Sequence, residues 1–265
     1  MNIFFRELKG NFKSLLIWCL AQFFIIYAGM LKYQGFSSSG VDINKLLEGF
    51  PKGLMAVFGV GSVDVSKVAG FYSVFFLYFM LLAGVHAIMF GAVVVSKEER
   101  DHSADFLFSK PVKRYQVITP KLLVGVVNIL IFNLVTFAAS VFFIALYNNG
   151  DGLVDKVALT MVALFVLQLF FLALGAMLGA VLKTTKLATS VSAFFVLGAF
   201  FLSVTVDLYN NLEFLKYLTP FKYFEGKVLM LDGTISLSSV GILLVLTFIL
   251  TSLSYIVFNQ RDLTT

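Results

Sequence analysis

The chain has 265 residues, of which 59% are hydrophobic and 13% are charged, and its net charge is +5. Because a soluble domain carries about 25% charged residues, this composition excludes an ordinary soluble domain and indicates a polytopic membrane protein. The apolar runs are continuous rather than alternating, so they predict helices and not a barrel. The positive charge therefore bears on membrane topology and lipid headgroups before nucleic acid.

Six apolar runs predict an all-α fold with six transmembrane helices in a single domain. The predicted spans cover about residues 15–34, 70–95, 117–147, 157–182, 187–206 and 237–258. An even number of spans places both termini on one side of the membrane. Of the 20 lysines and arginines, 12 lie in the segments 1–14, 96–121, 183–186 and 259–265. The positive-inside rule therefore predicts that both termini and the 96–116 loop are cytoplasmic.

The residues before the first span form an amphipathic pattern. The apolar residues of this segment are Phe4, Phe5, Leu8 and Phe12, and its basic residues are Arg6, Lys9 and Lys13. The two sets take opposite sides of a helix, which predicts an N-terminal amphipathic helix lying in the membrane interface. After the first span, residues 32–69 form a polar loop on the outer surface.

Small residues recur at helical spacing in two of the spans. Ala83, Ala87 and Gly91 repeat every four residues in the second span, and such a stripe allows two helices to approach closely. The fourth span carries a G-x-x-x-G pattern at Gly175 and Gly179. That pattern is common by chance in apolar helices, so it identifies no particular contact.

Four polar residues lie within the predicted spans: His86, Asn128, Asn133 and Gln168. An ionisable residue inside a membrane is a functional hypothesis by default, so these four residues are candidates for a translocation path. The structural alternative is that His86 is neutral and hydrogen-bonded to a neighbouring helix, and that the asparagines form hydrogen bonds between helices. The sequence leaves both interpretations open.

Residues 207–236 are half apolar and half polar, and Pro220 and Gly226 interrupt them. This segment is too polar to cross a membrane. It predicts short amphipathic or re-entrant helices on the extracytoplasmic surface, between the fifth and sixth spans.

The most strongly charged run is the loop between the second and third spans, residues 96–116. Ser96 and Glu99 match a capping box, which predicts a short helix. An apolar tip, Phe106–Leu107–Phe108, has charges on both sides, as an interface hot spot for a cytosolic partner would. Alternatively, the tip lies on lipid headgroups or packs against neighbouring spans. The candidate docking residues are Glu98, Glu99, Arg100, Asp101, Asp105, Phe106, Leu107, Phe108, Lys110, Pro111 and Arg114.

The pattern E-E-R-D-x-S-x-x-F-L-x-S-K-P-V-K-R-x-x-x-x-x-x-K in this loop resembles the loop between the second and third spans of type-2 ATP-binding-cassette exporter permeases. In that family an acidic cluster leads into a short coupling helix, followed by a leucine-rich turn, a Pro-hydrophobic-x-Arg step and a lysine. The matching positions here are Glu98, Glu99, Asp101, Leu107, Pro111, Val112, Arg114 and Lys121. The sequence departs at His102–Ser103, where the family often has a glycine-threonine pair.

The resemblance implies a permease in a bacterial cell membrane that docks cytosolic ATP-binding-cassette ATPase subunits through a cytoplasmic coupling helix in this loop. It also implies a second permease chain, identical or different. The sequence has no G-x-x-x-x-G-K-[ST] phosphate loop, so the chain is not expected to be an enzyme or to hold a cofactor. ATP and magnesium are expected on the partner ATPase. The apolar spans favour export of an amphipathic or hydrophobic substrate such as a peptide, drug or lipid-linked molecule.

Two other classes of protein compete with this interpretation. A secondary carrier or channel that needs no ATPase usually has ionisable residues at mid-membrane depth or inverted repeats. In this sequence only His86 lies near that depth, and the last three spans do not repeat the first three. A membrane-embedded enzyme would need a cluster such as H-E-x-x-H or paired aspartates, and the sequence has neither.

Overall fold

The computed structural model describes residues 3–38, 63–100, 114–147 and 152–260, with isolated positions between 44 and 60; at 98–100 and 210 it describes the backbone only. This part of the chain is helical and contains no strand. Six of its helices are long and apolar enough to cross a membrane, which confirms the predicted all-α, six-span fold. They are α1 (Ile3–Ser38), α4 (Val68–Arg100), α6 (Tyr115–Tyr147), α7 (Val154–Val181), α8 (Thr185–Leu208) and α9 (Leu237–Gln260).

The helix α1 is longer than a membrane span requires. Its 36 residues extend over about 50 Å, whereas the hydrocarbon core of a bilayer is about 30 Å thick. The amphipathic N-terminal segment and the first span therefore form one continuous helix. The position of that segment in the membrane interface stays a prediction.

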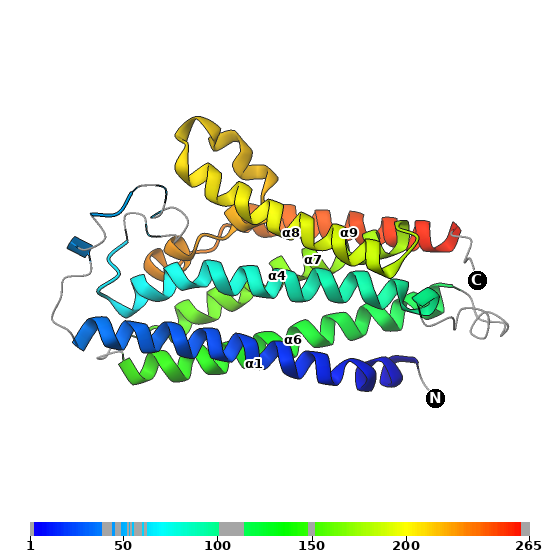
Figure 1. The fold of residues 1–265 in the computed structure, drawn as a ribbon, viewed down its shortest axis with the longest axis horizontal. Helices are drawn as coiled ribbons and strands as arrows, with labels where there is room; N and C mark the ends of the chain where they lie inside the picture. The colour runs from blue at the N-terminus through cyan, green and yellow to red at the C-terminus, as the bar shows by residue number, and fades with distance from the viewer. Residues whose placement is uncertain are drawn as a thin grey trace.

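The bundle is organised around α4 and α7, whose span regions are the most buried of the six, whereas α9 is the least buried. Figure 1 shows α1 and α6 on one side of α4, and α8 and α9 on the other. The start of α1 and the end of α9 lie at the same end of the bundle, as an even number of spans requires.

Glycines bring α4 and α7 into backbone contact. A Cβ atom built on Gly175 would lie 3.0 Å from the backbone nitrogen of Ala92, and one built on Gly179 would lie 2.6 Å from the carbonyl oxygen of Ala92. A Cβ on Gly91 of α4 would lie 2.8 Å from the backbone nitrogen of Ala176. The small-residue stripe of the second span and the G-x-x-x-G pattern of the fourth therefore meet each other.

The segment between α8 and α9 forms three short helices, η1 (Asn210–Leu218), η2 (Pro220–Tyr223) and the π-helical η3 (Val228–Asp232). It lies at the end of the bundle opposite the start of α1 (Figure 1). Phe221 and Phe224 are buried, and Thr219 Oγ1 donates a hydrogen bond of 2.8 Å to the carbonyl of Ala199. These contacts hold the segment against the bundle.

Candidate functional site

Most of the predicted docking residues lie outside the described residues, namely Asp101, Asp105, Phe106, Leu107, Phe108, Lys110 and Pro111. Glu98, Glu99 and Arg100 belong to the last turn of α4, where the structure describes the backbone only. Arg114 is described, at the start of α6. The structure therefore shows how the two ends of the loop are held. We call the residues Ser96, Lys97, Arg114 and Lys121 the loop base.

Arg114 connects the loop base to α9. Its Nη1 atom lies 3.0 Å from the carbonyl oxygen of Phe258 and 3.0 Å from that of Asn259. These carbonyls belong to the last turn of α9, where backbone oxygens have no partner within the helix and the helix dipole is negative. The guanidinium thus caps α9. One turn further along α6, Thr119 Oγ1 and the Tyr255 hydroxyl share a hydrogen bond of 2.8 Å.

The other end of the loop base, on α4, contacts α8 and α1. The hydroxyl of Thr185, at the start of α8, donates a hydrogen bond of 3.0 Å to the carbonyl of Ser96. Lys97 Nζ lies 3.1 Å from Oε2 of Glu7 in α1. Each of these contacts joins residues about 90 positions apart in the sequence, so they are tertiary links and not local turns.

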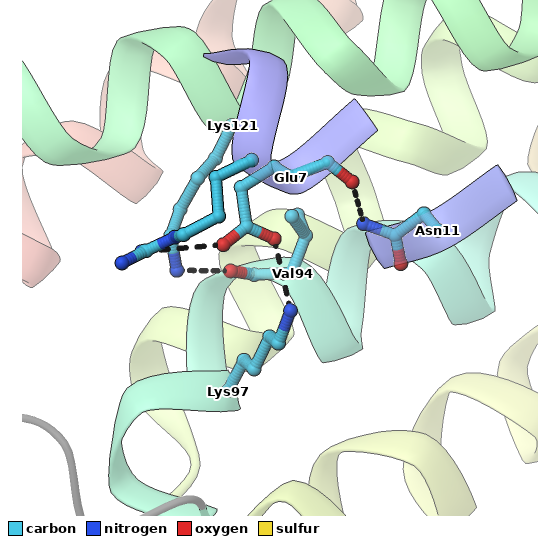
Figure 2. A network of polar contacts seen from close by, with 6 residues as sticks. Glu7, Asn11, Val94, Lys97 and Lys121 are labelled. Atoms are coloured by element: carbon cyan, nitrogen blue, oxygen red, sulfur yellow. Dashed lines mark hydrogen bonds and ion pairs between the residues drawn. The ribbon is translucent and has the colours of Figure 1, made fainter. Parts of the chain in front are cut away.

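Lys121 joins the two helices that flank the loop. It is fully buried, and its Nζ atom donates a hydrogen bond of 2.6 Å to the carbonyl of Val94 in α4. Figure 2 shows Glu7, Lys97 and Lys121 converging beside the last turns of α4. A buried ammonium group requires such partners because losing its hydration is costly. The loop base is therefore linked to α1, α8 and α9, and across itself through Lys121.

The four polar residues of the candidate translocation path are all buried inside the bundle of this one chain. Asn133 of α6 donates a hydrogen bond to Gln168 Oε1 of α7, and Gln168 Nε2 donates one of 3.4 Å to the carbonyl of Ala83 in α4. This set forms a bridge between three helices. Asn128 instead bonds within its own helix, to the carbonyl of Val124 at 2.8 Å. That any of these residues lines a path stays a prediction.

His86 lies among aromatic rings. Its imidazole stacks on Phe132, with ring centroids 4.9 Å apart, and Trp18 lies 5.5 Å away. Within the part of the chain that the structure describes, its Nδ1 atom has no hydrogen-bond partner, and neither does the side-chain amide of the fully buried Gln22. His86 is thus packed between α1 and α6.

Sequence reasoning missed Glu7 as a buried residue. Its spacing was the available signal. Glu7 lies about two helical turns before Leu15, so both residues lie on the same face of α1, and that face is buried. The amphipathic pattern pointed to the other face. Phe5 and Phe12 are 65% and 59% exposed, whereas Glu7 is 1% exposed. In a membrane, apolar side chains can face lipid, so hydrophobicity alone does not identify the inner face of a helix.

The fold and the loop base define a multi-pass α-helical membrane protein, with a charged loop whose two ends are fastened to three other helices. The family model for "ABC-2 family transporter protein" matches residues 1–263, nearly the whole sequence. The chain belongs to this family and is an ATP-binding-cassette transporter permease, a membrane component of transport. No curated protein matched the sequence.

Proposed function

We propose that the chain forms the translocation path of an exporter for an amphipathic or hydrophobic substrate, and that a separate cytosolic ATPase drives it. The loop 96–116 docks that ATPase, with Phe106, Leu107 and Phe108 as the apolar contact. ATP and magnesium bind to the ATPase. Two permease chains complete the transporter in a bacterial cell membrane, with both termini in the cytoplasm. The membership of the chain in the ABC-2 family carries this proposal.

The contacts of the loop base support the proposed coupling. A push on the loop reaches the ends of α4 and α6 first. From there, Ser96 contacts α8, Lys97 contacts α1 and Arg114 contacts α9. A small displacement at one loop is thereby distributed over most of the bundle, which is how rigid-body switching works in packed proteins.

The test is capture of the ATPase from membranes in which the tagged permease is co-expressed with candidate ATP-binding-cassette ATPases. We expect the wild-type chain to retain an ATPase that hydrolyses MgATP, and Leu107→Asp to lose it. Phe214→Asp is the matched control, because Phe214 is 68% exposed on η1 at the opposite end of the bundle. It introduces the same charge away from the loop and should leave capture unchanged.

The result that would overturn the proposal is a well-folded wild-type chain that captures no ATPase. Transport by that chain without ATP would identify an ATPase-independent carrier instead. Equal capture by wild type and Leu107→Asp would remove the apolar tip as the docking contact while leaving the transporter class in place.

A further inference from the structure

Glu7 is a buried carboxylate at the cytoplasmic end of α1. Its side chain is 1% exposed, and it lies 3.1 Å from Lys97 Nζ and 3.5 Å from Arg6 Nη2. A carboxylate removed from water must be paired to remain charged. Arg6 precedes Glu7 in the same helix and is about half exposed. Lys97 comes from α4 and is therefore the partner that links two helices.

The surroundings leave room for this contact. Gly10 lies one turn after Glu7 in α1, and a Cβ atom there would lie 3.7 Å from Lys97 Nζ. A larger side chain at position 10 would occupy the space through which the lysine reaches the carboxylate. Asn11 Nδ2 also donates a hydrogen bond of 2.8 Å to the backbone carbonyl of Glu7. Figure 2 shows Glu7 directed toward the end of α4.

The pair adds a charged link to a helix that α1 otherwise meets through apolar and aromatic side chains such as Trp18. The helix α1 packs mainly against α6 and much less against α4. Both α4 and α6 lead into the loop, one from each side. Because α1 is packed on α6 and ion-paired to α4, it connects the two helices that flank the loop.

We propose that the Glu7–Lys97 ion pair transmits movement of the loop to α1, which makes Glu7 a positioning residue for coupling between the ATPase and the membrane path. This inference rests on the proposed function. It assigns to the N-terminal turns of α1 a role beyond membrane association. It also predicts an asymmetry. Lys97 is 27% exposed and can turn to water when Glu7 is replaced by a neutral residue, whereas loss of Lys97 leaves the buried carboxylate with Arg6 as its ion-pair partner among the described residues.

The experiment uses the complex of permease and ATPase, and it compares the MgATP hydrolysis rate of the complex with that of the ATPase alone. The variants are Glu7→Gln, Lys97→Met, Gly10→Leu and the conservative Lys97→Arg. We expect the first three variants to capture as much ATPase as the wild type. The change that the permease causes in the MgATP hydrolysis rate should be at least threefold smaller with each of them. The loss should be largest for Lys97→Met. Lys97→Arg should retain the wild-type rate.

The matched control is Glu213→Gln, which makes the same change in net charge. Glu213 is exposed on η1 and pairs only with the exposed Lys216 among the described residues. Its replacement should therefore leave both ATPase capture and the MgATP hydrolysis rate unchanged. Thermal unfolding midpoints of the variants separate a coupling defect from a folding defect.

Each outcome decides the question. Suppose that the wild type captures an ATPase and that complexes with the Glu7 and Lys97 variants hydrolyse MgATP at the rate of the wild-type complex. The ion pair then does not transmit movement, and the proposed function stands. The inference is equally overturned if Glu7→Gln and Lys97→Met lose capture itself, or if Lys97→Arg is as defective as Lys97→Met. If the wild-type chain captures no ATPase, the proposed function fails and the inference fails with it.

Discussion

Replacing Gly175 by alanine should destabilise the protein through the contact between α4 and α7. The added Cβ would lie 2.9 Å from the carbonyl carbon of Ile88 and 3.0 Å from the nitrogen of Ala92, whereas ordinary contacts lie at 3.4–4 Å. Both neighbours are backbone atoms, which cannot rotate away. The carbonyl oxygen of Ile88 would lie closer still. The two helices must therefore separate by about one ångström, and overpacking of this kind costs about 1–3 kcal/mol.

The matched control is Gly198→Ala in α8. Gly198 is on an exposed face and has no atom within 4 Å of a built Cβ, so the substitution should stabilise the helix by about 0.5–1 kcal/mol. The assay is thermal unfolding of the solubilised protein, followed by the fluorescence of Trp18, the only tryptophan. The two substitutions should shift the midpoint in opposite directions. If Gly175→Ala is as stable as Gly198→Ala, the backbones of α4 and α7 are not in contact and the reasoning is wrong.

Two further predictions concern polar groups. Asn133→Leu should lower the free energy of unfolding by about 1 kcal/mol because it removes the amide donor to Gln168 Oε1. The double variant with Gln168→Leu should lower it by less than the sum of the two single variants, which a double-mutant cycle on unfolding midpoints measures. In the segment between α1 and α4, hydrogen bonds from Ser66 and Asn44 hold the pKa of Asp64 below its ordinary value of 3.8. Because its folded pKa is depressed, the carboxylate stabilises the fold above its unfolded pKa, and the contribution is lost as pH falls through the lowered value. Ser66→Ala should raise the pKa of Asp64 in a carboxyl NMR titration, and an unchanged pKa would contradict the assignment.

The sequence was sufficient to predict the six helices, because an apolar run long enough to cross a bilayer has few alternative structures. It also identified the small residues at Gly91 and Gly175, although it could not pair them. Close approach of two helices depends on which faces meet, and a pattern within one helix carries no information about its partner. The bridge from Asn133 to Gln168 was predicted as a kind of contact and not as a particular pair.

The inner face of α1 could not be predicted, and the reason is physical. In water, Phe5 and Phe12 would mark the buried side of a helix, but in a membrane they can face lipid. Glu7 faces the protein, where Lys97 of α4 lies 3.1 Å from its carboxylate, because a carboxylate that leaves water needs an opposite charge beside it. The same argument explains Lys121, which matched the lysine of the family pattern and is fully buried against α4. At these two positions, the charged residue is a better guide to helix packing than the apolar residues beside it.

The contacts around α4 differ in how much movement they allow. The seam between Gly91 and Gly175 brings backbone against backbone, so α4 and α7 cannot slide without breaking the close contacts between residues 88–92 and 172–179. The links from the loop base to α1, α8 and α9 are side-chain hydrogen bonds and one ion pair, which can re-form after a shift. A neutral hydrogen bond contributes about 1 kcal/mol and one to a charged group about 1.5–3 kcal/mol. Under the proposed function, a push on the loop must move α4 and α7 as one body. The adjustment then falls on α1, α8 and α9, where the polar links of the loop base determine how far each helix follows.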